Sequence, residues 1–253
     1  MKLKGKKILV TGGSNGIGRA LVQGFLEEGA SVFFSYFSDA ISADVICREA
    51  ALGGDGRAHA MACNIADQSQ AKQLVEQAIT TLGHIDVLVN NAGVFARQAF
   101  LEITEHELQR VISVNLINAM LISQQVARHM VSCETPGSLI HISSLSAQRA
   151  RSRMVHYQAS KAALNAMSEG IALELGEYGI RSNVISPGLT ETQANRDQWG
   201  DSPDLWRVRA ADIPLGRAGL PHDYLGAAVL LASDDSQWIS GANIRVDGGM
   251  ATF

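Results

Sequence analysis

Lys7-Ile-Leu-Val-Thr-Gly-Gly-Ser-Asn-Gly-Ile-Gly18 is the stretch that decides the fold of this 253-residue chain. Its first part, Lys7–Thr11, is a short apolar run typical of a buried β-strand, and its glycines then mark a tight turn. Residues 17–28 follow with the pattern of an amphipathic helix, which Gly29 ends. Glycine allows close approach to a ligand, and a helix N-terminus offers N–H groups and a positive dipole end to phosphates. The stretch therefore predicts a strand, turn and helix that hold a pyrophosphate.

Outward from this unit, short apolar runs alternate with helical segments, including long helices expected at Thr104–Met130 and Val155–Tyr178. Such alternation indicates right-handed βαβ units with a ligand at the carboxyl edge of the sheet. We therefore expect a single α/β domain over residues 1–253, a doubly wound parallel sheet of about seven strands with helices on both faces. The predicted strands are Lys7–Thr11, Ser31–Ser35, Arg57–Cys63, Asp86–Asn90, Ser138–Ser143, Arg181–Ile185 and Asn243–Val246.

Tyr157 and Lys161 lie four residues apart, and Ser144 precedes Tyr157 by thirteen residues. On a helix, this spacing places Tyr157 and Lys161 on one face. A nearby ammonium favours the phenolate form of tyrosine, whose ordinary pKa is ~10, and a serine can orient a substrate oxygen. Alone, such a pair is more often an apolar ring beside a solvated ammonium. Together with the glycine turn, it indicates an enzyme that exchanges hydride with a nicotinamide while tyrosine handles the proton.

Composition and charge exclude several other classes of protein. Hydrophobic residues make up 46% of the chain, and the net charge of −4 argues against a nucleic-acid partner. Cys47, Cys63 and Cys133 are widely spaced, so we expect reduced thiols and no disulfide framework. No apolar run suits a signal peptide or a membrane span, and the scattered histidines and cysteines predict no metal site. We expect a cytoplasmic protein without a membrane partner.

Six segments stand in the order and spacing of the short-chain dehydrogenase/reductase family, which the chain resembles over essentially its whole length. They are the glycine turn at 11–18, Asn90–Gly93, Asn115 in Ser-Val-Asn-Leu, Ser144 in Ile-Ser-Ser, the segment Tyr157–Lys161, and Ser186–Gly188. The resemblance implies a Rossmann-type fold, an NAD(P)-dependent alcohol/carbonyl oxidoreductase with a small-molecule substrate, and a homotetramer.

The resemblance also implies roles for single residues. Asn115, Ser144, Tyr157 and Lys161 resemble the family's catalytic tetrad, in which Asn115 would hold a water that links Lys161 to solvent. The long irregular stretch from Leu189 to Leu220 corresponds to the substrate lid, around residues 189–220. The positions that correspond to cofactor contacts are Gly12, Ser14, Asn15, Gly16, Ile17, Gly18, Ser35, Tyr36, Asn64, Ile65, Asn91, Ala92, Gly93, Tyr157, Lys161, Pro187, Gly188, Thr190 and Thr192.

The choice between NAD and NADP stays open. An acidic residue at the end of the second strand would favour NAD, and a basic residue there or before Gly16 would favour NADP. Tyr36 and Phe37 occupy the first of these positions and Asn15 the second, so neither signature is present. Ser35 and Ser38 could bond either ribose hydroxyls or a phosphate. Asn64, where the family commonly has aspartate, can still accept a hydrogen bond from the adenine amine.

Arg149, Arg151 and Arg153 lie between Ser144 and Tyr157 and have two interpretations. They could bind an anionic substrate, since arginine pairs with carboxylate or phosphate, or they could form a solvated loop or subunit contact. His156 adjoins Tyr157, but neighbouring helix positions point in different directions, which argues against an acid–base role.

Three functions remain possible. The first is a dehydrogenase for a sugar, a polyol or a small secondary alcohol, because the segments around Ser144, Tyr157 and the closing Val-Asp-Gly-Gly resemble sugar-oxidising members. The second is a 3-oxoacyl-carrier-protein reductase, whose acidic partner would need a basic surface near the pocket entrance. The third is a non-catalytic nucleotide-binding module, against which the complete tetrad argues.

Overall fold

A computed structural model describes residues 1–52 and 57–251 of the chain. Its seven-stranded sheet is parallel throughout, with the strand order β3-β2-β1-β4-β5-β6-β7, and the predicted fold class is confirmed. The strands are β1 (Lys7–Val10), β2 (Ser31–Tyr36), β3 (Ala58–Ala62), β4 (Val87–Asn90), β5 (Gly137–Ile142), β6 (Ile180–Pro187) and β7 (Asn243–Val246).

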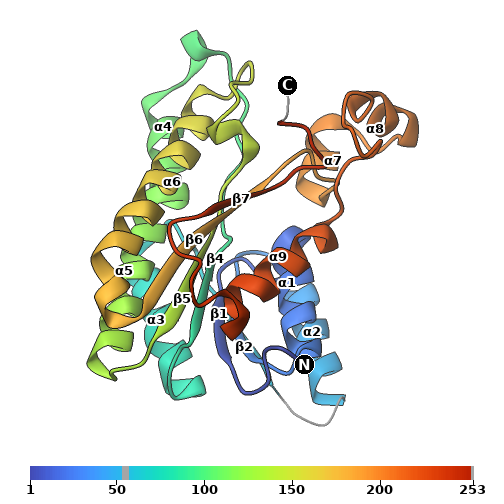
Figure 1. Cartoon of the computed structure of the whole chain (residues 1–253). Helices are drawn as coiled ribbons and strands as arrows, with labels where there is room; N and C mark the ends of the chain where they lie inside the picture. Colours follow the sequence, from blue (N-terminus) through green and yellow to red (C-terminus); the bar gives the residue numbers. More distant parts are fainter. Residues whose placement is uncertain (53–56, 252–253) are drawn as a thin grey trace.

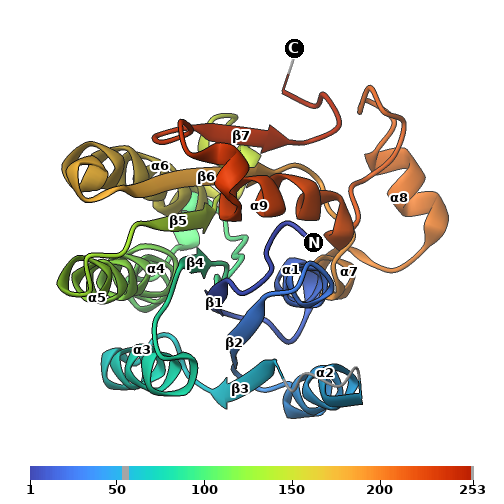
Figure 2. The same cartoon turned by 60° about the horizontal axis from the view of Figure 1, so that its bottom comes forward.

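Helices cover both faces of this sheet. Figure 2 shows α1, α2 and α9 on one side, and α3, α5 and α6 on the other. Within the described residues, no helix is both long and apolar enough to cross a membrane. The α-helices are α1 (Gly16–Glu27), α2 (Ala40–Leu52), α3 (Gln68–Leu82), α4 (Glu105–Ile112), α5 (Asn118–Ser132), α6 (Val155–Leu175), α7 (Gln193–Trp199), α8 (Pro203–Arg209) and α9 (Leu225–Ala232).

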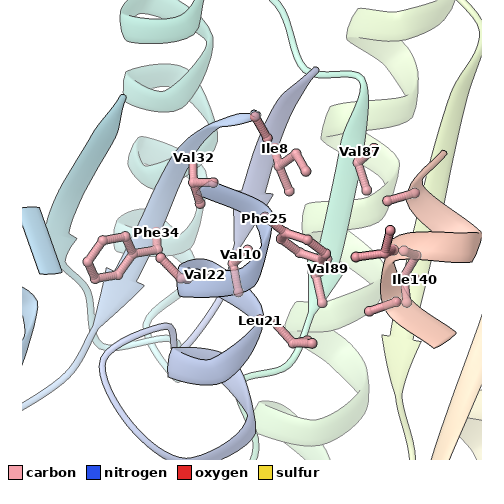
Figure 3. Close-up of a cluster of buried hydrophobic side chains, with 14 of the residues drawn as sticks. Ile8, Val10, Leu21, Val22, Phe25, Val32, Phe34, Val87, Val89 and Ile140 are labelled. Atoms are coloured by element: carbon pink, nitrogen blue, oxygen red, sulfur yellow. The ribbon is translucent and has the colours of Figure 1, made fainter. Parts of the chain in front are cut away.

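Two apolar clusters hold the layers together, one on each face of the sheet. Successive strand residues point to opposite faces, so Ile8 and Val10 join the cluster under α1 whereas Leu9 joins the cluster under α3 and α5. Figure 3 shows Phe25 of α1 among the strand side chains of the first cluster. Phe25 is fully buried, which stabilises the fold by about 1.5–3 kcal/mol relative to an exposed ring.

The direction of strand order reverses between β1 and β4, which are hydrogen-bonded neighbours. Ligands of doubly wound folds bind outside the carboxyl ends of the strands at such a reversal. The segments that follow β1 and β4 are both glycine-containing turns. Thr11 joins them, because its hydroxyl oxygen accepts hydrogen bonds from the backbone N–H groups of Asn91 (3.0 Å) and Ala92 (2.9 Å). The topology therefore brings two sequence motifs about eighty residues apart to one edge.

Two expectations about elements need correction. The helix expected at Thr104–Met130 is divided, because a π-helical turn, Ser113–Ile117, separates α4 from α5. Residues 189–220 are not irregular throughout: they contain α7 and α8, which Figure 1 shows projecting beside the C-terminal segment. The separate apolar cluster of Trp206, Ala210 and Ile213 explains this order, because short helices need packing partners to be stable.

Candidate active site

A cavity of about 1120 Å³ runs along the carboxyl edge of the sheet. All residues predicted to contact the cofactor line it, and so do Ser144, Tyr157 and Lys161. Ligand pockets usually measure ~300–1,000 Å³, so this space suits an extended cofactor together with a small substrate. Among residues 1–52 and 57–251, no group of three or more His, Cys, Asp or Glu side chains could hold a metal ion.

The glycine turn before α1 has the shape of a phosphate cradle. Gly12 and Gly16 have φ of +68° and +51°, a region where glycine is favoured. A Cβ on Gly18 would lie 2.1 Å from the carbonyl oxygen of Gly12, so the turn closes only without a side chain there. A Cβ on Gly16 would meet only Thr192, at 3.6 Å, which leaves room above the turn. The cradle therefore fits a dinucleotide pyrophosphate beside the start of α1.

The far end of the cavity is lined by Tyr36, Phe37 and Asn64. Phe37 is 72% exposed, so an apolar ring stands in solvent where a charged residue would select between the two cofactors. The hydroxyl oxygen of Ser35 accepts from the N–H of Gly12 at 3.0 Å and so supports the glycine turn, while the contact of Ser35 with the cofactor stays a prediction. Asn64 Oδ1 accepts from the N–H of Ala66 at 3.1 Å and keeps a second lone pair.

Tyr157 stands on α6 and Ser144 at the end of β5, and the sheet edge brings them together. Burial raises the pKa of Tyr157, and a hydrogen bond with Ser144 acts in the opposite direction. The hydroxyl oxygen of Ser144 also accepts from the N–H of Ser146 at 3.1 Å, which fixes its position. Ser144 and Tyr157 therefore lie close to each other at the sheet edge.

Lys161 is buried one turn further along α6, and its ammonium donates to the carbonyl oxygen of Ile142 at 2.8 Å. Burial lowers the pKa of Lys161 to about 8.

Asn115 does not line the cavity, because its side-chain amide is hydrogen-bonded to the backbone of Val94 and to the hydroxyl of Ser160. Lys161 Nζ and Asn115 Oδ1 nevertheless flank Gly93, where a Cβ would lie 3.4 Å and 3.3 Å from them. Asn115 lies in the π turn, a feature frequent at functional sites.

Residues near the end of β6 support the cavity from the other side. A Cβ on Gly188 would lie 2.8 Å from Asp247, so this position requires glycine for close packing. The hydroxyl of Thr190 donates to the carbonyl oxygen of Gly188 and lies 2.5 Å from the hydroxyl of Tyr224. Thr192 begins α7, and its hydroxyl oxygen accepts from the N–H of Asn195. Both threonines line the cavity while also holding residues 189–220 in place.

Sequence reasoning missed the side chains that line the cavity beyond Tyr157. Phe95 and Arg97 follow the Asn90–Gly93 motif, and Trp199 and Arg209 come from α7 and α8. The proximity of Phe95 and Arg97 to a recognised motif was an available signal. Trp199 gave no comparable signal, because its approach depends on how residues 189–220 fold.

The three arginines after Ser144 separate in the structure. Only Arg151 lines the cavity. Arg149 donates to the carbonyl oxygen of Ala251, and Arg153 lies 4.0 Å from Glu102. His156 is 2% exposed and does not line the cavity, in agreement with the prediction that it points away from the reacting groups.

Comparison with known proteins shows which family the chain belongs to. Residues 12–251 match the family model described as "Enoyl-(Acyl carrier protein) reductase". An L-rhamnose 1-dehydrogenase (NAD(P)(+)) from Sphingomonas sp. is 38% identical, over 98% of this chain and 97% of that protein. Three more proteins called L-rhamnose 1-dehydrogenase are 34–36% identical.

Solved structures agree with the sequence comparison. A short-chain dehydrogenase/reductase from Serratia marcescens superposes with a TM-score of 0.90 at 33% identity, covering 99% of this chain and all of that one. A blue fluorescent protein from a metagenomic library, solved in complex with NADPH, gives a TM-score of 0.89 at 37% identity over 99% of this chain and all of that one. The chain therefore belongs to the short-chain dehydrogenase/reductase family, whose members are NAD(P)-dependent oxidoreductases acting on CH–OH groups.

Proposed function

We propose that this protein is a sugar dehydrogenase that oxidises the C1 hydroxyl of an aldose such as L-rhamnose. The observation that carries the proposal is one continuous cavity with a phosphate cradle at its centre and Ser144, Tyr157 and Lys161 at one end. The rhamnose-oxidising relatives, similar over nearly their whole length, support the choice of a sugar. Phe95 and Trp199 line the same space as Ser146 and Gln193, which suits a substrate with apolar C–H faces and many hydroxyls.

Each residue of the tetrad has a separate task in this proposal. Ser144 donates a hydrogen bond to the substrate oxygen, and the phenolate oxygen of Tyr157 accepts the hydroxyl proton. The ammonium of Lys161 favours the phenolate electrostatically, and Asn115 holds the backbone around Gly93 beside it. A nicotinamide, when bound, would supply the acceptor for the hydride that leaves C1. Tyr157 therefore controls only the proton.

The cofactor would extend from Tyr157 across the glycine turn to Tyr36 and Asn64. NAD and NADP both fit this path, because no charged side chain stands at the end of β2. Gly12, Gly16 and Gly18 would meet the pyrophosphate, and Thr192 the carboxamide. Residues 189–220 would act as the substrate lid, since α7 and α8 supply one wall of the cavity.

A 3-oxoacyl-carrier-protein reductase is the second candidate. Arg97, Arg151 and Arg209 are exposed where they line the cavity, and none forms an ion pair within the part of the chain that the structure describes. An acidic carrier protein would be attracted to such side chains. Asp197 and Asp212 line the same cavity and offset part of this charge.

The deciding experiment compares initial rates on a defined panel. L-rhamnose, other aldoses and polyols are offered with NAD and with NADP, and 3-oxoacyl thioesters are offered with the reduced cofactors. Formation of reduced cofactor on an aldose, with no turnover of the thioesters, supports the sugar proposal. Turnover confined to the thioesters would replace it with the second candidate.

We also infer that the protein is a cytoplasmic homotetramer. Cys47, Cys63 and Cys133 are free thiols, as expected of a reducing compartment. Ile117 of the π turn and Met120 and Leu121 of α5 are 39–47% exposed, which suits burial against another subunit. Light scattering coupled to size exclusion tests the assembly, because a monomer at micromolar concentration contradicts it.

A further inference from the structure

Phe95 stands between Tyr157 and the proposed lid. Its ring centroid lies 5.0 Å from that of Tyr157 and 5.7 Å from that of Trp199, and both ring planes meet its own at 88°. Edge-to-face pairs at such distances contribute about 0.5–1.5 kcal/mol beyond the area they bury. Phe95 belongs to the segment after β4, whereas Trp199 ends α7. The three rings therefore connect the lid to the proton-transferring tyrosine.

The lid contains an apolar cluster, against which Met250 of the C-terminal segment also packs, and a base where its two ends are paired. Trp206, Ala210, Ile213 and Ala218 form a buried cluster against which Trp199 packs. At the base, a β-bridge pairs Thr190 with Gly219. Trp199 is thus supported by the lid on one side and contacts Phe95 across the cavity on the other.

Two guanidinium groups hold the indole of Trp199. The Arg209 guanidinium, from α8, lies 5.0 Å from the ring centroid, and that of Arg97 lies 5.9 Å away. Arg97 belongs to the same segment as Phe95, so the wall opposite the lid contributes one of the two cations. Cation–π contacts at exposed sites contribute about 0.5–1 kcal/mol each. Trp199 is thereby fixed from both walls of the cavity.

We propose that Phe95 is a positioning residue for Tyr157, and that Trp199 acts on catalysis through Phe95. The Ser144 hydrogen bond holds the tyrosine only at its hydroxyl, whereas Phe95 restrains the ring itself. A misplacement of ~1 Å at a reacting atom can cost ~100-fold in rate. When the lid covers the substrate, Trp199 supports Phe95, and the hydroxyl of Tyr157 is then held at the transferred proton. This inference rests on the proposed role of Tyr157.

A double-mutant cycle on kcat tests the proposal. Phe95→Ala and Trp199→Ala should each lower kcat by about tenfold or more, and the double variant should be no slower than the slower single variant, within about twofold. Such non-additivity is expected only if the two side chains act in series. Phe95→Tyr, which keeps the ring, should restore kcat to within about threefold of the native value. Losses that multiply, or a rise in KM at unchanged kcat, would overturn the proposal.

Controls separate positioning from folding and from the substrate assignment. Trp238→Ala is the matched control, because this tryptophan is fully exposed, and its kcat should equal the native value. Cofactor affinity should change by less than about threefold in every variant, since none of the replaced side chains belongs to the proposed cofactor contacts. If Phe95→Ala does not yield folded enzyme, Phe95→Leu takes its place in the cycle, with the same expected outcomes.

The cycle uses whichever secondary alcohol the native enzyme oxidises. A lack of aldose turnover therefore refutes the sugar proposal without affecting the positioning proposal. In the Tyr157→Phe background, adding Phe95→Ala should change the residual kcat by less than about twofold, because no hydroxyl remains to be placed. A further large loss there would show that Phe95 acts elsewhere in the site.

Discussion

Tyr157 and Lys161 are affected by burial in opposite directions, and both shifts disfavour charge. Burial raises the pKa of Tyr157 and lowers that of Lys161 to about 8. At Tyr157 burial outweighs the opposing effect of the Ser144 hydrogen bond, and the expectation that the Lys161 ammonium favours phenolate stays a prediction. A bound oxidised nicotinamide, which carries a positive ring, would add the charge that favours phenolate.

Replacing Tyr157 by phenylalanine removes the hydroxyl that we propose transfers the proton, and it keeps the ring contact with Phe95. We expect kcat to fall by at least ~100-fold, the lower end for general acid–base catalysis, while cofactor affinity changes little. Steady-state rates and equilibrium binding of the cofactor provide the two measurements. Near-native turnover in this variant would mean that another group is the base.

Lys161→Met should shift the pH dependence of alcohol oxidation. The proposed mechanism needs phenolate, so kcat/KM should rise with pH, and the loss of a buried positive charge should move this rise to higher pH. The native ammonium is present below pH about 8, so the difference between the two enzymes should be largest there and shrink above it. A profile that does not move, in a variant that still binds cofactor, rules out this role for Lys161.

At the scale of elements, the site depends on how strands end and how helices are interrupted. The turn after β1 closes against Asn91, whose side-chain amide donates to the carbonyl oxygens of Thr11 (3.0 Å) and Gly12 (2.8 Å). The π turn between α4 and α5 sets Asn115 beside Gly93. These contacts join elements that are distant in sequence, so the position of the turn after β1 depends on Asn91, and the position of Gly93 depends on Asn115.

The end of β2 should control the choice of cofactor. Tyr36 and Phe37 carry no charge, so native selectivity between NAD and NADP should stay within ~2 kcal/mol, or about thirtyfold. Tyr36→Asp should favour NAD by accepting from the ribose hydroxyls and repelling a 2′-phosphate, and Phe37→Arg should favour NADP. The ratio of kcat/KM values for the two cofactors, in all three proteins, is the measurement. If both substitutions leave the ratio unchanged, the adenosine ribose does not lie near this strand end.

At the scale of the whole molecule, a polar network crosses the middle of the parallel sheet. His141 of β5 is fully buried, its Nδ1 lies 3.2 Å from Asn90 Nδ2 of β4, and its Nε2 lies 3.3 Å from the hydroxyl of Ser182 in β6. Asn90 Nδ2 also donates to Ser123 on α5. Neutral imidazole can accept at Nδ1 and donate at Nε2, which satisfies both neighbours.

Global stability should therefore respond to acid through His141. Burial lowers its pKa from 6.5 to about 3, so between these values the unfolded chain binds one more proton than the folded protein. Native stability should fall as pH drops through this window, by up to about 1.4 kcal/mol per pH unit from this group.

His141→Gln should be less stable than the native protein at pH 7, because the network is disturbed, but should lack this acid-dependent loss. The difference in free energy of unfolding should consequently shrink as pH falls from 6.5 towards 4. Urea denaturation at several pH values measures it, with the exposed His106→Gln as matched control. A difference that stays constant with pH would contradict the buried neutral histidine.

The sequence by itself determined the parallel α/β fold and most of the cavity lining. Buried parallel strands are continuous apolar runs, and a glycine turn or a Tyr–Lys pair on one helix face is set by local chain geometry, so these features can be recognised within short segments. Strand ends differed from prediction by one or two residues because hydrogen-bond pairing, and not composition, decides where a strand stops.

Only the tertiary structure decided which side chains line the cavity beyond Tyr157. Residues 189–220 appeared irregular because their helices are short and gain stability from the cluster around Trp206. The contacts of Phe95 with Tyr157 and Trp199 join three segments distant in sequence. The hydroxyls of Ser35 and Thr190 hold other parts of the protein, which no local pattern predicts. Such contacts depend on which elements the fold brings together, and a side chain's partners are fixed only when the chain has packed.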